Sequence, residues 1–367
     1  MRIRGADASL RGIPSRRSSA TRPRPRLTLL AAAALALALA LVASTGSVAA
    51  AAPDSATLAA ADIVQTALAL DVELAPKPAI RPPKRSKTLA GPVPPSLLAT
   101  LHVAATTMSL PYLDGCHGAP ATTTRCVYGN LSSKTTIALF GDSHALSWFP
   151  AVLKVAQHRG WRLLNLTRSA CIPAGIIPYN RRLGFVMRSC QVWRDQAIAR
   201  LVREHPAIIL VSGTRGFATV DSAGRLLSGK AKTDAWIKGM NRTLARLVPA
   251  AGRVILLADT PSSLLASPAT CLARNPGNAL KCSTTVAHAI SYPWLNTEYG
   301  VAKAMKAGFL DVERWVCPTS PCPAIIGNRL VYRNPGHLTA SFTASQWLRL
   351  EQAILKDLAR RHYGHWP

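Results

Sequence analysis

The sequence predicts an α/β fold in which a mainly parallel sheet carries helices on both faces. Two observations support this: short apolar runs alternate with longer amphipathic ones from about residue 94 onward, and 49% of the 367 residues are apolar, enough for a large core. Strands are expected at 136–140, 162–166, 207–212, 253–258 and 308–312, with a short one at 330–332. Helices are expected at 146–158, 191–204, 233–247, 295–307 and 341–360. The long excursions at 172–190 and 260–294 are expected to wall a functional site.

Residues 1–52 are expected to form a signal peptide or a signal anchor. Arginines from Arg2 to Arg26 precede an apolar run at 27–43, and small residues follow at 47–52. This order is typical of a secretory signal. The apolar run is long for a cleaved signal and short for a membrane span, so both forms stay open. In either case the rest of the chain is exported, and is secreted or tethered to the membrane.

Residues 53–93 are expected to be a linker, because they are rich in alanine and proline and proline at this density prevents regular structure. Residues 94–367 then form one domain. We found no internal repeat in the sequence, and it says nothing about the oligomeric state.

The formal net charge of +27 suggests an anionic partner. Nucleic acid is not favoured, because the basic residues are scattered and no zinc-finger spacing, glycine-rich RNA motif or basic zipper is present. An anionic envelope or glycan fits better. A solvated basic surface without a specific partner is the simpler alternative.

The eight cysteines are expected to form disulfides, since their number is even and an export signal precedes them. They fall into four pairs of near neighbours, for which sequential pairing is the simplest assumption among many: Cys116 and Cys126, Cys171 and Cys190, Cys271 and Cys282, Cys317 and Cys322. Zinc is the competing interpretation for the last pair. It is not favoured, because no second cysteine pair lies near it in sequence.

A candidate nucleophile follows the first strand of the predicted sheet. The apolar residues 137–140 stop at Gly141-Asp142-Ser143-His144, and an amphipathic run follows. This order predicts a strand, a tight turn and a helix, with Ser143 at the edge where open α/β sheets bind ligands. Near the other end, His337 lies just before the last predicted helix. The two can meet as an acyl-transfer nucleophile and its base. The alternative is that Asp142 or Ser143 merely caps the helix.

Several segments together resemble the SGNH (GDSL-type) hydrolase superfamily, and more narrowly the SGNH domain attached to acyltransferase-3 membrane proteins that O-acetylate surface polysaccharides. The segments are Cys126-Val-Tyr-Gly-Asn130, Phe140-Gly-Asp-Ser-His-Ala145, Leu166-Thr-Arg-Ser-Ala-Cys171, Cys190-Gln-Val-Trp193 and Val331-Tyr-Arg-Asn-Pro-Gly-His-Leu-Thr339. The resemblance implies a flavodoxin-like three-layer α/β/α sandwich. It also implies that Ser143 is the nucleophile and His337 the general base and acid. No metal or organic cofactor is suggested.

Asn334 departs from the family pattern, which usually has an aspartate three residues before the histidine. Asparagine can accept from the ring N–H but brings no charge. In a serine protease the same exchange reduces turnover by about 10⁴-fold. Three interpretations follow: a slow enzyme, a substitute carboxylate such as Asp311 or Glu313, or a domain that binds glycan without turnover.

The predicted oxyanion hole is also incomplete. The Ser143 amide should be its first donor, but the usual second-strand glycine and third-strand asparagine are missing, so Gly213 and Thr214 are the replacement candidates. Asp142 is expected to shape the turn, and His144 to pack or hydrogen-bond locally. Arg168 and Arg215 are candidates for holding an anionic substrate group, with plain surface charge as the alternative. Trp315 is the candidate for stacking on a sugar.

These features predict an exported O-acyltransferase or esterase acting on acyl groups of envelope polysaccharide or peptidoglycan. Related proteins carry a multi-span membrane domain that brings the acyl group across the membrane, so transfer implies a separate membrane acyltransferase as partner. A catalytically weak or inactive glycan-binding scaffold is the second hypothesis, and Asn334 favours it. A lipase-like hydrolase is the third, although the sequence shows no broad apolar lid.

Overall fold

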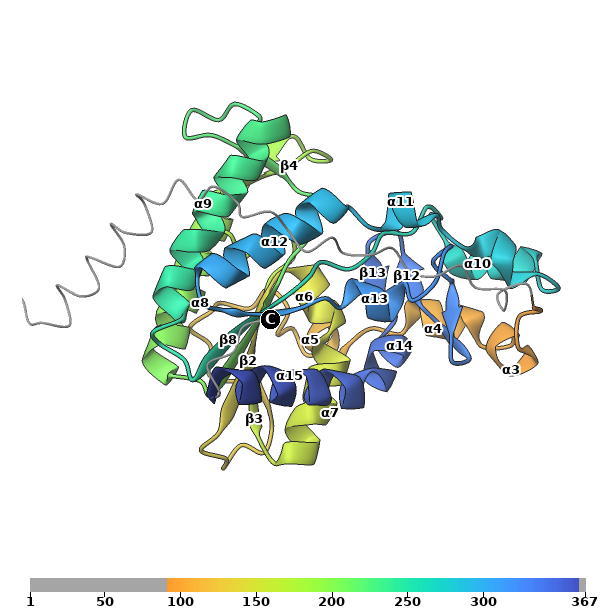
Figure 1. Ribbon diagram of the computed structural model, residues 1–367, viewed down its shortest axis with the longest axis horizontal. Coiled ribbons are helices and arrows are strands. Elements are labelled where there is room, and N and C mark those ends of the chain that lie inside the picture. The colour runs from red at the N-terminus through yellow and green to blue at the C-terminus, as the bar shows by residue number, and fades with distance from the viewer. Residues whose placement is uncertain (1–90, 363–367) are drawn as a thin grey trace, which may run out of the picture. The chain divides into compact units, whose positions relative to one another are not determined.

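A computed structural model describes residues 91–362 of the protein (Figure 1). The expected signal segment and nearly all of the expected linker lie outside these residues. Within residues 91–362, no helix is both long and apolar enough to cross a membrane.

The centre of the fold is a six-stranded sheet in the order β1-β3-β2-β6-β8-β9. Five of the strands run parallel and β1 pairs with β3 in the antiparallel sense. The strands are β1 (Val127–Gly129), β2 (Thr136–Gly141), β3 (Arg162–Thr167), β6 (Ile208–Ser212), β8 (Arg253–Leu257) and β9 (Gly308–Leu310). The α/β class and the five parallel strands are as predicted, whereas the edge strand β1 is not predicted by the sequence pattern.

Helices cover both faces of this sheet (Figure 1). Alternate residues of the buried strand β2 face opposite layers: Ile137 and Leu139 pack with one set of helices, and Ala138 and Phe140 with the other. The first set is α7 (Phe149–Arg159), α14 (Ala340–Ser345) and α15 (Trp347–His362). The second is α8 (Ser189–Glu204), α9 (Gly229–Leu247) and α12 (Tyr292–Ala304). The result is a three-layer sandwich.

Two expected helices are interrupted. The first is divided into α6 (Ser143–Ser147) and α7, with Pro150 in the first turn of α7. Proline is tolerated there because the first amides of a helix have no partner within it. The last expected helix is divided in the same way into α14 and α15.

The strand expected at 330–332 is wrong as a member of the main sheet. The chain there forms two small hairpins, β10–β11 (Ile325–Ile326, Arg329–Leu330) and β12–β13 (Tyr332–Asn334, His337–Leu338). The second hairpin turns at Pro335-Gly336, so it places Asn334 opposite His337 in register. This turn therefore sets the relative position of two of the predicted site residues.

The two long excursions carry structure of their own. The first contains the hairpin β4–β5 (Ile177–Asn180, Phe185–Val186), which joins β7 (Ala218–Val220) in a separate three-stranded sheet. The second contains α10 (Pro268–Arg274), a 3-10 helix (Ala279–Cys282) and α11 (Val286–Ala289). The remaining short helices are α3 (Pro95–Leu98), α4 (Leu101–Thr106), α5 (Leu110–Leu113) and α13 (Glu313–Val316).

Four disulfides join the cysteines as neighbouring pairs: Cys116–Cys126, Cys171–Cys190, Cys271–Cys282 and Cys317–Cys322. The pairing is the sequential one assumed from the sequence. Each bridge closes a short segment outside the parallel strands, so the bridges restrain loops around a sheet that has its own apolar core.

Candidate active site

Ser143 stands at the carboxyl end of the central strand β2, as the first residue of α6. The turn before it requires glycine. Gly141 has a φ of +150°, and a Cβ atom there would lie 1.8 Å from the carbonyl oxygen of Ser212 on the neighbouring strand. Asp142 then caps α6, since one carboxylate oxygen accepts from the His144 amide at 2.8 Å. The strand, the glycine and the cap together fix the position of Ser143.

His337 and Asn334 complete a relay to this serine. The His337 Nε2 atom lies 2.9 Å from the Ser143 Oγ atom, and its Nδ1 atom lies 2.9 Å from the Asn334 Oδ1 atom. The same oxygen accepts from the backbone amides of Gly336 and His337, at 3.2 and 3.0 Å. Because three N–H groups converge on it, the amide presents its oxygen to the ring. Nδ1 therefore carries the proton and Nε2 is left as the acceptor for the serine hydroxyl.

His337 is a weak base in this setting. Burial, and then the positive charges of His144 and Arg333, lower its pKa to about 3. Asn334 supplies no opposing charge. Neither of the carboxylates considered as substitutes takes its place: Asp311 pairs with Arg314 at 2.8 Å and Glu313 pairs with Arg215 at 2.6 Å. The ring is thus neutral and correctly oriented, but its imidazolium form is poorly stabilised.

A second histidine–carboxylate pair lies beside the first relay. The His144 Nδ1 atom is 2.6 Å from the Asp259 Oδ1 atom, and the Thr260 hydroxyl lies 3.0 Å from the same ring nitrogen. Burial alone would lower the pKa of His144, but Asp259, through its charge and its hydrogen bond, raises this pKa to about 9. His144 is therefore an imidazolium ion at neutral pH.

The expectation that His144 bonds locally is wrong, since Asp259 lies 115 residues away in sequence. Asp259 was missed. The available signal was its place two residues after the end of β8, at the same sheet edge as Ser143.

Asp142 and the third-strand end hold each other. The second Asp142 oxygen accepts from the Thr214 amide at 2.9 Å, and the carboxylate is fully buried. The Thr214 amide is thus not available to an oxyanion, which corrects one part of the prediction. Its hydroxyl oxygen accepts from Gly216 at 3.0 Å and keeps a proton for donation. Gly213 has a packing role as well, because a Cβ atom there would lie 2.5 Å from Pro173.

Arg215 does not face a substrate, contrary to the prediction. It is 9% exposed, and its guanidinium binds two buried carboxylates, Glu298 at 2.5 Å and Glu313 at 2.6 Å. Its backbone amide also donates to Asp259 at 2.7 Å, so this ionic cluster continues to the His144 pair. The side chain is fully used in holding the fold together.

The other two binding candidates differ in their surroundings. Trp315 is 9% exposed and packs edge to face on Trp148, with Arg349 over its ring, so it has no free face for a sugar and that prediction is wrong. Arg168 is half-buried. Its amide donates to the Gly141 carbonyl at 3.1 Å, which places it at the site edge, and its guanidinium reaches the Ser189 hydroxyl at 3.4 Å.

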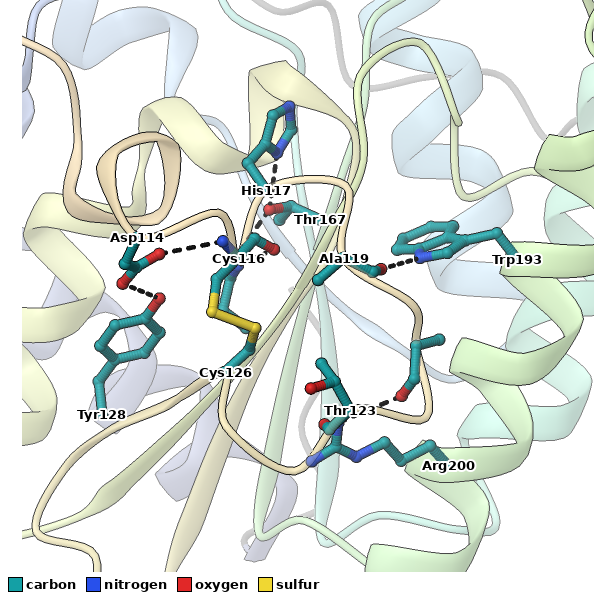
Figure 2. The surroundings of a disulfide bond; sticks show 12 residues. Asp114, Cys116, His117, Ala119, Thr123, Cys126, Tyr128, Thr167, Trp193 and Arg200 are labelled. Atoms are coloured by element: carbon teal, nitrogen blue, oxygen red, sulfur yellow. Dashed lines mark hydrogen bonds between the residues drawn. A yellow bond between two sulfur atoms is a disulfide. The ribbon is translucent and has the colours of Figure 1, made fainter.

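The loop closed by Cys116–Cys126 brings His117 to the same sheet edge (Figure 2). The His117 ring lies 3.0 Å from the Thr167 hydroxyl through Nδ1 and 2.8 Å from the Ser169 hydroxyl through Nε2. Burial, and then Arg333, lower its pKa to about 4, so the ring is neutral. Sequence reasoning missed His117, because nothing local connects it to strand β3 some fifty residues later.

A largely parallel sheet with a serine–histidine pair at its carboxyl edge defines the class of SGNH-fold hydrolases and acyltransferases. A family model described as "SGNH domain (fused to AT3 domains)" matches residues 115–349, more than half of the chain, and the protein belongs to this family. No curated protein in the comparison matches the chain.

Solved structures show the same fold. The periplasmic domain of a lipopolysaccharide acetyltransferase from Salmonella ser. Paratyphi A has 16% identity and a TM-score of 0.52, over 69% of this chain and 99% of that one. An acetylxylan esterase from Geobacillus stearothermophilus has 15% identity and a TM-score of 0.34, over 62% and 96%. A GDSL-like lipase from Bacteroides thetaiotaomicron has 13% identity and a TM-score of 0.34, over 62% and 89%.

Proposed function

We propose that the protein is an extracytoplasmic serine O-acyltransferase or esterase, acting on acetyl groups of envelope polysaccharide or peptidoglycan. The observation that carries the proposal is the 2.9 Å contact between Ser143 Oγ and a His337 whose Nδ1 is held by Asn334. Family membership supports acyl chemistry, and the acetyltransferase domain of similar fold supports a surface glycan as substrate.

In this mechanism the Ser143 hydroxyl attacks the acyl carbonyl while His337 Nε2 takes its proton. The oxyanion that develops is stabilised by the Ser143 amide, one of the first amides of α6 and therefore without a partner inside the helix. The Thr214 hydroxyl is the second donor. His337 then returns the proton to the departing oxygen, which leaves an acyl ester on Ser143.

A sugar hydroxyl or water resolves this ester, with His337 again removing the proton of the attacking group. Water gives an esterase and a sugar hydroxyl gives a transferase. For transfer, the acyl donor is supplied by a separate membrane acyltransferase, a partner suggested by the fusion that gives the family its description.

Location outside the cytoplasm is supported by chemistry. Four disulfides persist in an oxidising compartment and are rare in the cytosol. The Salmonella domain of similar fold is described as periplasmic. Whether the chain is secreted or tethered depends on residues 1–52.

A glycan-binding scaffold without turnover is the second candidate, and one observation favours it. His337 has a neutral amide where a carboxylate usually stands, and an imidazolium 5.1 Å away between ring centroids opposes its protonation.

Acetyl-ester hydrolysis by the purified protein tests both candidates, with Ser143→Ala as the matched variant. Turnover of aryl or glycan acetates that disappears in Ser143→Ala, together with an acetylated Ser143 peptide by mass spectrometry, supports the enzyme. Equal background rates for both proteins, with unchanged circular dichroism, leave the scaffold.

A further inference from the structure

Arg333 is a guanidinium at the active site without an acidic partner among residues 91–362. It lies on β12, directly before Asn334, and is half-buried. The buried arginines of the described chain are all bonded: Arg194 and Arg200 donate to backbone carbonyls, and Arg215 binds carboxylates. Arg333 differs from these residues in having no oxygen acceptor.

The groups that do contact Arg333 are poor partners for a charge. One terminal nitrogen points at the thioether sulfur of Met108, and the guanidinium carbon lies 5.5 Å from the centre of the Tyr112 ring. Its Nε atom is buried and has no hydrogen-bond partner. Removing a cation from water without an oxygen acceptor is unfavourable, and an anion at this position would relieve the penalty.

The position of Arg333 relates this charge to the reacting groups. Its field lowers the pKa of both His337 and His117, so it lies within electrostatic range of each ring. Tyr112 connects the two sides of the cluster: it carries Arg333 over its ring and meets the His117 ring edge to face, at 4.7 Å between centroids.

An exposed hydroxyl completes the cluster. Gly141 and Thr167 are partners across the parallel pair β2–β3, and Ser143 and Ser169 each lie two residues further along. The neutral His117 donates from Nδ1 to Thr167, whose own hydroxyl donates to Asn165, so Nε2 accepts from Ser169. The Ser169 oxygen therefore keeps acceptor capacity at the same edge as the nucleophile.

We propose that Arg333 binds an anionic group, a carboxylate or a phosphate, on the carbohydrate whose ester reacts at Ser143, with the His117–Ser169 pair contacting a neighbouring hydroxyl. This inference rests on the proposed function and specifies its substrate class as acidic glycan. A formal charge of +27 over the whole chain would assist the approach of such a polymer.

Binding to the Ser143→Ala protein tests the site without requiring turnover. Three probes are titrated by calorimetry at moderate and high salt: an oligogalacturonide, a phosphorylated oligosaccharide and a neutral xylooligosaccharide. A charge-assisted hydrogen bond is worth about 1.5–3 kcal/mol, so Arg333→Gln is expected to weaken binding of an acidic probe by roughly 10- to 100-fold. Binding of the neutral probe should not change, and Arg333→Lys should restore part of the affinity. The acidic probe that responds identifies the anion.

Arg329→Gln is the matched control, because it removes one exposed arginine four residues away on β11. An equal loss in Arg329→Gln and Arg333→Gln would mean that general charge attracts the glycan, and the site would be rejected. Equal affinity of the wild-type side chain for acidic and neutral probes would reject it too.

Kinetics on a neutral aryl acetate separate recognition from tuning of His337. Recognition predicts that Arg333→Gln leaves this rate unchanged. A shifted pH profile on the neutral ester, with unaltered glycan binding, would show that Arg333 acts only on the histidine and would overturn the proposal. If no ester is hydrolysed but Arg333-dependent binding persists, the anion site stands and the proposed enzymatic function fails.

Discussion

His144 and His337 meet edge to face with ring centroids 5.1 Å apart, and only His337 reaches Ser143. The two rings have opposite partners. Asp259 holds His144 as a cation, whereas Asn334 gives His337 hydrogen bonding without charge. A fixed positive charge thus stands next to the ring that must become positive when Ser143 attacks, and this geometry predicts a slow nucleophilic step.

Asn334→Asp should increase turnover. A carboxylate at this position stabilises the His337 imidazolium, and the reverse exchange in a serine protease reduces turnover by about 10⁴-fold, so we expect a gain of at least about tenfold in kcat. The His337 pKa, now about 3, should rise, and the acidic limb of the pH–rate profile should move upward with it. Steady-state rates from pH 4 to 9 measure both effects. Asn328→Asp, on an exposed turn, is the charge-matched control, and a similar gain in both variants would contradict the relay.

The His144–Asp259 pair should make stability depend on pH. The folded-state pKa of His144 is raised from 6.5 to about 9, so its contribution is complete below pH 6.5 and is lost as the pH rises through 9. The expected loss of unfolding free energy is on the order of 3 kcal/mol. Urea unfolding at pH 6.5 and 9.5 measures it.

His144→Gln should remove most of this difference and lower stability at pH 6.5, since Asp259 is then buried without its cation. His158→Gln changes a 55% exposed side chain paired with Glu351, and it should leave the pH dependence in place. An unchanged pH dependence in His144→Gln would show that His144 is not the titrating group.

Gly141→Ala should destabilise the protein by more than about 3 kcal/mol and abolish activity. A Cβ atom would overlap the Ser212 carbonyl, which belongs to the neighbouring strand and cannot move alone. Gly160→Ala is the comparison, because Gly160 is also left-handed, at φ +64°, but has nothing within 4 Å of a Cβ atom. Its cost should be about 1–2 kcal/mol. Similar losses in the two variants, by urea unfolding, would place the penalty in backbone conformation rather than in the contact.

Arg215→Met should lower stability by about 3–5 kcal/mol, because Glu298 and Glu313 lose their shared cation inside the protein. Adding Glu298→Gln and Glu313→Gln should recover part of the loss. Thermal unfolding compares these variants with Arg168→Met, whose side chain has no acidic partner among residues 91–362 and should change stability little. A stable Arg215→Met protein with impaired glycan binding would instead favour the original assignment of Arg215 to the substrate.

The amino-acid sequence by itself determined the α/β architecture and the chemical type of the site. Buried parallel strands and amphipathic helices are patterns over five to twenty consecutive residues, so Thr136–Gly141 and Ser189–Glu204 are recognisable without a structure. The turn at Gly141-Asp142-Ser143 and the sequential disulfides are local in the same sense.

Only the tertiary structure decided the electrostatics of the site. Asp259, Glu298 and Arg333 come from separate strands, helices and hairpins, and their roles depend on which charge each one meets after folding. Arg215 and Arg333 are both arginines near a strand end, yet one is neutralised by two glutamates and the other has no acidic partner among residues 91–362. Coulombic energy and burial depend on distances in space, and those distances follow from the packing of elements far apart in the chain.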